Sequence, residues 1–320
     1  MGTMVFGESG SRGTAPETAR DMIAGYISAG GNFIDTANVY AGGKSEEIIG
    51  QAIAPYNRDS LVLASKGRFP TASEPNAQGL SRKHLCSAVD GSLSRLGTDY
   101  IDVYYLHMWD PLTPLEETVR TMDDLVRTGK VRYFGLSNFR AWQAMKIQAM
   151  ARNAGIPLIA AQYQYSLVVR DIEYELPSLC AEEGLGIVPW GPLGGGFLSG
   201  KYSSRSHPAQ GRLASASNNQ EESWFRRATE RNWRILTEVN TLASAYRAST
   251  PQIALSWLLS RPQVDAVIIG ARTPEQMQDN LASVDLQLKP NELTRLNEVS
   301  RLPELYPYRM IEDYGKRELT

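Results

Sequence analysis

The sequence is poor in cysteine and histidine, with two of the first and three of the second in 320 residues. Cys86 and Cys180 both lie in segments with helical character, which favours free, buried thiols over a disulfide. The histidines are scattered, and no Cys/His spacing typical of zinc ligands occurs. We therefore expect no metal site.

The sequence also lacks long apolar runs and an excess of charge of one sign. No apolar stretch approaches the roughly 20 residues that span a bilayer, and the first residues do not form a signal peptide. The net charge is −2, and no basic stripe suited to a phosphate backbone occurs. These absences predict a cytoplasmic protein that binds neither a membrane nor nucleic acid.

The chain alternates short apolar runs with longer amphipathic stretches, which predicts βαβ units with parallel strands. Eight such units fit a closed (β/α)8 barrel, the TIM barrel, as a single domain over residues 1–320. The expected strands are Thr3–Phe6, Phe33–Asp35, Leu61–Ser65, Ile101–Leu106, Val131–Leu136, Leu158–Gln162, Ile187–Pro189 and Val264–Ile269. The expected helices are Pro16–Ala29, Ser45–Ala54, Arg82–Leu96, Leu115–Arg127, Ala141–Ala154, Glu173–Glu183, Asn232–Tyr246, Pro251–Leu259 and Pro274–Ala282.

Two segments fall outside this alternation. Lys201–Arg231, after the seventh expected strand, is long and rich in Ser, Asn, Gln and Arg, which is typical of a lid or binding loop. The tail Pro303–Thr320 carries three tyrosines, and we expect it either to pack across the barrel mouth or to fray.

Four ionisable residues stand at or just after the ends of expected strands, where a TIM barrel carries its active site. They are Asp35, Tyr40, Lys66 and His107. Taken singly, each has an ordinary structural explanation as a helix cap, a solvated surface group or a core histidine. Together they suit protonation of a carbonyl oxygen while hydride reaches its carbon. Lys66 favours the phenolate and lowers the pKa of Tyr40, Asp35 keeps the lysine charged, and His107 orients the carbonyl.

Two segments come close to phosphate-binding P-loops. Residues 38–45 have Asn38 in the first glycine position, and residues 195–202 have Tyr202 where a Ser or Thr must bind magnesium. No strict G-x-G-x-x-G follows an expected strand. We therefore set aside an NTPase and a Rossmann mode of dinucleotide binding.

Over essentially its whole length, the sequence resembles the aldo-keto reductase family, in the branch of bacterial reductases and potassium-channel beta-subunit-like members. The resemblance rests on Gly30–Ala37, Tyr40, Gly43–Glu46, Lys66 and His107. It implies that Tyr40 is the general acid, that Asp35 and Lys66 tune it, and that His107 positions the substrate carbonyl.

The resemblance also implies an NADP(H) cofactor. Trp190 is expected to stack on the nicotinamide, while Gly191, where relatives commonly have serine, implies a backbone contact to phosphate. Arg272 precedes a helix N-terminus and so favours the extra phosphate of NADPH over NADH. The expected cofactor contacts are Thr3, Met4, Asp35, Ser137, Asn138, Gln162, Trp190, Gly191, Pro192, Leu193, Gly194, Gly196, Lys201, Arg212, Gly270, Arg272, Gln276 and Asn280.

We therefore expect an enzyme that reduces an aldehyde or ketone to an alcohol, or runs in reverse, as a monomer or homo-oligomer. Met108 and Trp109 are expected in the substrate wall, with Trp224 and the tail tyrosines as further candidates. Relatives carry a hairpin ahead of the first barrel strand, and we expect it to be absent here. The alternative is a cofactor-binding regulatory subunit of a larger complex with little turnover.

Overall fold

A sheet of six parallel strands forms the centre of the protein. The structure, a computed structural model, describes residues 1–10, 13–156, 158–202, 211–215 and 221–315. Paired residues such as Ser137 and Gln162 lie side by side at the carboxyl ends of neighbouring strands. The strand ends that carry polar residues therefore meet at one edge, as the sequence predicts. In chain order, which is also their order in the sheet, the strands are β1 (Phe33–Asp35), β2 (Val62–Gly67), β3 (Ile101–Leu106), β4 (Val131–Ser137), β5 (Leu158–Gln162) and β6 (Gly186–Ile187).

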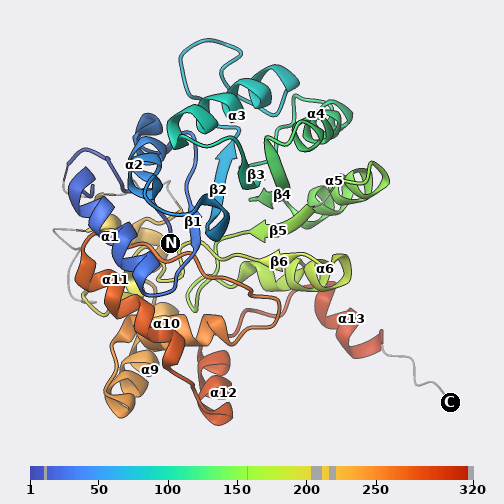
Figure 1. Cartoon of the computed structure of the whole chain (residues 1–320). Coiled ribbons are helices and arrows are strands. Elements are labelled where there is room, and N and C mark those ends of the chain that lie inside the picture. The colour runs from blue at the N-terminus through green and yellow to red at the C-terminus, as the bar shows by residue number, and fades with distance from the viewer. Residues whose placement is uncertain (11–12, 157, 203–210, 216–220, 316–320) are drawn as a thin grey trace.

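Helices surround this sheet on the outside (Figure 1). None of them, within the described ranges, is long and apolar enough to cross a membrane. The longer helices are α1 (Pro16–Ser28), α2 (Lys44–Ile53), α3 (Arg82–Leu96), α4 (Leu115–Arg127), α5 (Ala141–Asn153), α6 (Leu176–Glu183), α9 (Glu230–Tyr246), α10 (Thr250–Leu259), α11 (Pro274–Leu281) and α12 (Pro290–Val299). The short ones are α7 (Arg212–Ser215), α8 (Trp224–Arg227), α13 (Tyr308–Tyr314) and the 3-10 turns η1 (Tyr40–Gly43), η2 (Arg58–Ser60), η3 (Asp171–Tyr174), η4 (Phe197–Ser199) and η5 (Ala282–Asp285).

The first and eighth predicted strands are not regular strands. Their neighbourhoods form isolated bridges, between Gly2 and Asp35 and between Ile187 and Val264. After Gly2 the chain turns, because the Phe6 amide donates back to the Thr3 carbonyl at 2.9 Å. In the other segment, the backbone facing it includes Pro189, which accepts from Ile268 N at 2.9 Å but has no N–H to donate in return. The prediction of eight regular strands is therefore wrong for these two segments.

The same two segments nevertheless lie against each other and against β1. Gly2 N donates to Ile269 O at 2.8 Å, and Thr3 N donates to Asp35 O at 3.1 Å. On the other side, Ile187 N donates to Gln263 O at 2.7 Å. Hydrogen bonds therefore continue from β6 through residues 263–269 and residues 2–3 to β1.

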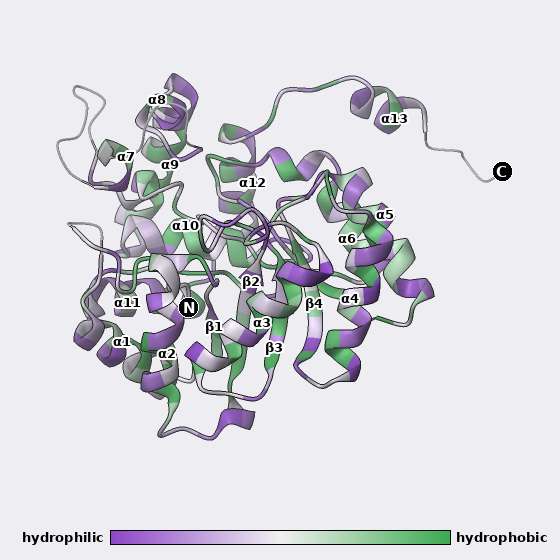
Figure 2. Cartoon of the chain, turned by 90° about the horizontal axis from the view of Figure 1, so that it is seen from above, coloured by the Kyte–Doolittle hydropathy of each residue, from purple (hydrophilic) through white to green (hydrophobic). Residues whose placement is uncertain are grey.

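The two faces of the sheet bury different side chains, because successive residues of a strand point to opposite faces. Leu63 and Tyr104 belong to the large apolar cluster shared with the surrounding helices. Ala64 and Tyr105 belong to a smaller interior cluster that also takes in Ile268. In Figure 2, hydrophobic colour is concentrated in the central strands, and hydrophilic colour appears on the outward sides of the helices.

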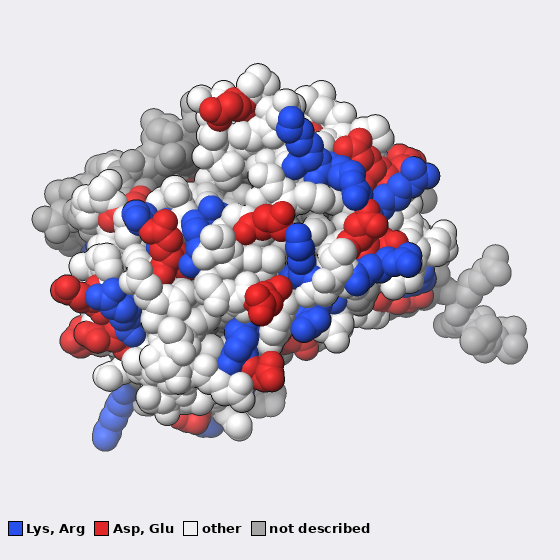
Figure 3. All heavy atoms as spheres, turned by 45° about the horizontal axis from the view of Figure 1, so that its top comes forward, with Lys and Arg blue, Asp and Glu red and all other residues white. Residues whose placement is uncertain are grey.

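Charges of both signs are interspersed on the face shown in Figure 3, without a broad patch of one sign. Several of them form surface ion pairs, such as Lys44 with Glu47 at 2.6 Å and Lys130 with Asp90 at 2.7 Å. Exposed pairs of this kind contribute about 0–1 kcal/mol each, so they bear little on the stability of the fold.

The tail, as far as Gly315, does not cover the carboxyl ends of the strands (Figure 1). Helix α13 lies at the periphery beside α6 (Figure 1), where Tyr308 stacks on Tyr174 with ring centroids 5.2 Å apart. Tyr306 and Tyr314 are exposed, so the predicted packing across the mouth is wrong for the described part of the tail. Residues 316–320 of the tail, and residues 203–210 and 216–220 of the predicted binding loop, lie outside the described residues.

A close approach at Gly135 allows Tyr105 to fill the sheet interior. A Cβ at this position would lie 2.4 Å from the Tyr105 ring and 3.0 Å from Ala160 O. We expect Gly135→Ala to lower the free energy of unfolding by about 1–3 kcal/mol because of this overlap.

The matched control is Gly25→Ala on the exposed side of α1, where an added Cβ meets nothing within 4 Å. That change should raise stability by about 0.5–1 kcal/mol. Urea unfolding of both variants checks the pair, and equal effects of the two substitutions would contradict this account of Gly135.

Candidate active site

Polar side chains end or closely follow the first five strands, at one edge of the sheet. Asp35 ends β1, Lys66 is the next-to-last residue of β2, and His107 directly follows β3. Ser137 ends β4 and Gln162 ends β5. Parallel pairing brings these positions together, as the sequence predicts.

A buried ion pair lies at the centre of this edge. Lys66 Nζ donates to Asp35 Oδ1 at 2.5 Å, to Thr36 O at 2.7 Å and to Tyr40 Oη at 3.3 Å. These bonds use all three donors of the ammonium group. Burial lowers the pKa of Lys66, but the nearby Asp35 and Tyr40 oxygens outweigh it, so the net pKa is raised. Lys66 is therefore a fixed cation, although its side chain has 0% exposure.

Tyr40 faces this cation from a turn with unusual backbone geometry. It begins η1, whose next three residues, Ala41, Gly42 and Gly43, have φ values of 49°, 63° and 94°. This left-handed region suits glycine but strains alanine. The turn lets α2 begin at Lys44. The Tyr40 ring stays beside Lys66, with 5.0 Å between Lys66 Nζ and the ring centroid.

The net pKa of Tyr40 is raised, mainly by burial. Burial raises this pKa and is opposed by Lys66, while the Asp35 carboxylate raises it further; the net pKa lies above the usual value of 10.0. Lys66 lowers the pKa of Tyr40, as the sequence predicts, but burial outweighs this effect. Because Lys66 donates to the phenol oxygen, the phenol keeps its own proton for a partner in the cavity.

His107 is a neutral imidazole. Burial, with the positive charges of Lys66 and Arg68, lowers its pKa well below 6.5. Its ring lies edge-on to Phe69 at a centroid distance of 4.7 Å and to Tyr40 at 6.1 Å. Nδ1 is buried and has no hydrogen-bond partner among the described residues. A neutral imidazole has one N–H donor and one acceptor, so it can orient a carbonyl oxygen without adding charge.

The amides predicted to contact a cofactor already bond to protein atoms. Asn138, with φ 59°, donates from Nδ2 to His107 O at 3.1 Å and to Ser137 Oγ at 2.9 Å. Its Oδ1 accepts from Trp190 Nε1 at 3.2 Å. Gln162 Nε2 donates to Asp35 Oδ2 at 2.7 Å. These side chains therefore organise the site as well as line it.

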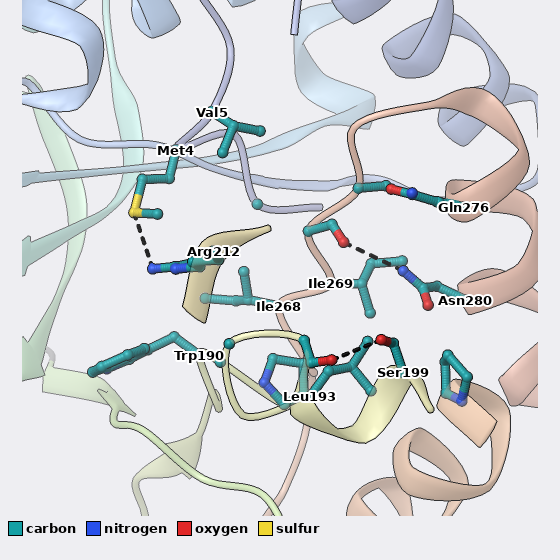
Figure 4. A pocket seen from close by; sticks show the side chains of 18 of the residues that line it. Met4, Val5, Trp190, Leu193, Ser199, Arg212, Ile268, Ile269, Gln276 and Asn280 are labelled. Carbon is teal, nitrogen blue, oxygen red and sulfur yellow. Dashed lines mark hydrogen bonds between the residues drawn. The ribbon is translucent and has the colours of Figure 1, made fainter. Parts of the chain in front are cut away.

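A cavity of about 1170 Å³ opens beside Tyr40 and His107 and extends across the edge of the sheet. Figure 4 shows a part of it, with Trp190 and Leu193 on one wall, Met4 and Arg212 on another, and Gln276 and Asn280 on α11. The predicted residues that line it are Thr3, Met4, Asp35, Tyr40, His107, Ser137, Asn138, Gln162, Trp190, Gly191, Pro192, Leu193, Gly196, Lys201, Arg212, Gly270, Arg272, Gln276 and Asn280. Lys66 is buried behind Tyr40, and Gly195 lines the cavity where Gly194 was predicted.

Four cations line the cavity: Lys201, Arg212, Arg247 and Arg272. Partial burial and the nearby positive charge of Arg272 lower the pKa of Lys201. Arg212 forms an ion pair with Glu222 at 2.5 Å and approaches the Met4 sulfur at 3.8 Å. Cations that crowd one another in this way match an anionic ligand.

Two predicted cofactor contacts on α11, Gln276 and Asn280, bond to the backbone of residues 270–272. Gln276 Oε1 accepts from Arg272 N at 3.0 Å, and Asn280 Nδ2 donates to Gly270 O at 3.3 Å. Thr273 Oγ1 caps α11. A side chain added at Gly270 would meet no atom within 4 Å, so this wall is open to a ligand. The cavity therefore fits an elongated anionic cofactor, with an aromatic wall at Trp190 and cations at the other end.

The residues predicted for the substrate wall do not line this cavity in the described structure. Met108 and Trp109 lie outside the cavity lining, and Trp109 instead packs edge-on to Phe139 at 5.6 Å and Trp142 at 5.7 Å. Trp224 contacts Tyr202 and Trp233 rather than the cavity. These aromatic side chains are used in packing between loops and helices, which residue type alone does not distinguish from a substrate wall. No group of three or more His, Cys, Asp or Glu in the described ranges is placed to hold a metal ion.

Sequence reasoning missed several residues of the lining. Val39 and Phe69 line the cavity near Tyr40 and His107. The position of Phe69 was predictable from the sequence, because it follows Lys66, at the end of an expected strand, by three residues. Glu222 and the corner between α9 and α10, residues 240–251, carried no such signal. A helix corner reaches the cavity only through the tertiary arrangement.

A lysine, a carboxylate, a phenol and an imidazole are gathered at the carboxyl edge of a parallel sheet, in an α/β protein. Residues 1–301 match the family model described as "Aldo/keto reductase family". The chain belongs to this family, which confirms the resemblance seen in the sequence. It is accordingly an oxidoreductase of a family that reduces carbonyl groups with nicotinamide cofactors.

Curated relatives include both reductases and channel subunits. Norsolorinic acid reductase of Aspergillus flavus is 34% identical over 320 residues, covering 96% of this chain and 78% of that protein. An uncharacterised oxidoreductase of Bacillus subtilis is 34% identical over 325 residues, covering 96% of this chain and 95% of that protein. A probable voltage-gated potassium channel subunit beta of Oryza sativa is 36% identical over 271 residues, covering 84% and 82%.

The neutral state of His107 predicts a pH dependence of stability. In the unfolded chain this histidine takes up a proton near pH 6.5, whereas the native site resists it. Acid therefore favours the unfolded state, and stability falls as pH drops below 6.5. When the pH is lowered from about 6.5 to about 5.5, the free energy of unfolding should fall by about 1 kcal/mol more for wild type than for His107→Gln.

Urea unfolding of both proteins at these two pH values measures the difference. A constant gap between the two would mean that His107 binds its proton equally well in the native protein.

Proposed function

We propose that the protein is an NADPH-dependent reductase that converts an aldehyde or ketone to an alcohol, with Tyr40 as the general acid. The observation that carries the proposal is the pair of bonds from Lys66 Nζ to Asp35 and Tyr40, beside a cavity that also exposes His107. This arrangement offers a phenolic proton to the cavity and a cation to stabilise the phenolate left behind. A small carbonyl compound as partner and a cytoplasmic location are part of the proposal.

The proton transfer follows from these contacts. When bound, the reduced nicotinamide supplies a hydride to the carbonyl carbon. The Tyr40 O–H bond breaks as its proton passes to the carbonyl oxygen, and Lys66 stabilises the phenolate across 3.3 Å. The neutral His107 imidazole holds the carbonyl oxygen near Tyr40 without competing as an acid. In the reverse direction the phenolate accepts the alcohol proton.

NADPH is preferred in this proposal because of the cations at the far end of the cavity. Arg272 precedes α11, where the helix N-terminus also favours an anion. Lys201 lies close enough to Arg272 for its pKa to be lowered by that charge. Together they match a ligand with more negative charge than NADH carries.

The proposal extends to the fold. Hydrogen bonds run from β6 through residues 263–269 and residues 2–3 to β1, and so connect the two edge strands of the six-stranded sheet. We propose that these two segments complete the barrel, in place of the regular first and eighth strands.

The alternative is a cofactor-binding regulatory subunit with little turnover. The observation behind it is the similarity to the Oryza sativa probable channel subunit beta, at 36% identity. The two functions differ in whether cofactor oxidation depends on Tyr40, so the next experiment separates them.

Tyr40→Phe removes the transferable proton while keeping the ring over Lys66. We expect the rate of NADPH oxidation with an aromatic aldehyde to fall about 10²–10⁴-fold, because general acid catalysis is lost. NADPH binding, followed by fluorescence quenching, should change little. Equally slow oxidation by wild type and variant would reject the enzyme and leave the regulatory subunit.

Arg272→Ala tests the coenzyme preference. Loss of a charge-assisted contact to phosphate should raise KM for NADPH about 10–100-fold and leave KM for NADH nearly unchanged. Arg301→Ala is the control, since Arg301 is exposed and outside the cavity lining. A wild-type preference for NADH would rule out the role given to Arg272.

A further inference from the structure

Both oxygens of the buried Asp35 carboxylate have their own donor. Lys66 bonds to Oδ1 at 2.5 Å, and Gln162 Nε2 bonds to Oδ2 at 2.7 Å. Asp35 and Gln162 are each 2% exposed and Lys66 is fully buried, so water does not replace either donor. The ends of β1, β2 and β5 are joined through this one carboxylate.

The bonds form a chain that ends at the proposed acid. It runs from Gln162 to Asp35, then to Lys66, and finally to Tyr40 at 3.3 Å. Gln162 also lines the cavity, which is the only role the sequence predicted for it. Its amide NH₂ group is, however, already donating to Asp35.

We propose that Gln162 is a positioning residue for the acid: its bond to Asp35 holds the carboxylate against Lys66 and thereby sets the proton affinity of Tyr40. This inference rests on the proposed function. It assigns Gln162 a part in proton transfer in addition to any contact with the cofactor.

The direction of the effect follows from charge. A hydrogen bond from Gln162 spreads and stabilises the negative charge on Asp35. Without it, more of that charge is available to attract protons onto Lys66 and Tyr40. Asp35 already raises the pKa of Tyr40, so loss of the amide should raise the proton affinity of Tyr40 further.

Other titratable groups also act on this pair. Those facing Tyr40, Asp35 or His107 are the amino group of Met1 and the side chains of Asp35, Tyr40, Lys66, Arg68, Tyr105, His107 and Arg212. A substitution at Gln162 acts directly on Tyr105 as well as on Asp35, because the Gln162 amide lowers the pKa of Tyr105 against the effect of burial. The side chains of the other groups are the same in the wild type and its Gln162 variants.

The test is the pH profile of alcohol oxidation by the full chain with NADP⁺. Gln162→Met keeps the length of the side chain and removes the donor. We expect the midpoint of the profile to move up by about half to one pH unit. At neutral pH, kcat/KM should fall about threefold for both alcohol oxidation and carbonyl reduction. The fall is smaller than the change in the proton affinity of Tyr40, because the rate of proton transfer responds to only part of that change.

Ser137→Ala is the matched control, because Ser137 lines the same part of the cavity and has no bond to Asp35. Its midpoint should stay at the wild-type value, whatever happens to cofactor affinity. A midpoint shift of the same size in Ser137→Ala would overturn the inference.

Gln162→Glu is the second variant, in case the methionine variant does not fold. In the alkaline range where Tyr40 titrates, this glutamate is ionised and adds negative charge beside Asp35, so the midpoint should move further up. Unchanged midpoints in both Gln162 variants, with only the Kd for NADPH altered, would show that Gln162 is a cofactor contact alone.

Failure of the proposed function has a different signature. If wild type shows no turnover with any carbonyl or alcohol, that function is rejected. The tyrosine absorbance of each protein is then titrated against its Tyr40→Phe counterpart. The same upward shift in Gln162→Met supports the positioning role without catalysis, and no shift rejects it.

Discussion

The buried pair of Lys66 and Asp35 is the interaction on which the rest of the site depends. Removing two charges from water costs several kcal/mol per ion, and the pair is stable only when its remaining hydrogen-bonding capacity is satisfied. Here three acceptors surround the ammonium and two donors hold the carboxylate. These groups belong to β1 and the residue after it, β2, β5 and η1. The hydrogen bonds of the pair therefore form only when these strands are in the correct register. A shift of any of these strands would leave an uncompensated charge.

The cavity joins two regions of different electrostatic character. Near Tyr40 the reactive groups are neutral, because burial raises the pKa of the phenol and lowers that of His107. At the other end Lys201 and Arg272 supply positive charge. Under the proposed function this asymmetry orients the cofactor, with its phosphates at the cationic end and its reactive ring among neutral groups.

The sequence was sufficient to locate the residues whose position depends on strand ends. Asp35, Lys66 and His107 each follow an apolar run, and parallel pairing places such residues together. It was insufficient for quantities that depend on burial: the net pKa of Tyr40 is set by desolvation, which no spacing reveals. The sequence also did not predict that Trp109 packs against Phe139 and Trp142 instead of lining the cavity. Nor did it predict that the first and eighth expected strands are irregular, because this follows from a turn after Gly2 and from the backbone partners of residues 264–269.

Asn138 is shared between the two sides of the cavity. One amide group donates to the carbonyl of His107 and accepts from the indole of Trp190. A phenylalanine at position 190 would deprive the amide oxygen of its donor, and an aliphatic residue at position 138 would deprive the indole of its acceptor. The identities of these positions are therefore not independent: a change in the aromatic wall at Trp190 requires a compatible change at Asn138, beside His107. Under the proposed function, exchange of cofactor-side residues alone, during divergence or in design, would carry a cost on the substrate side.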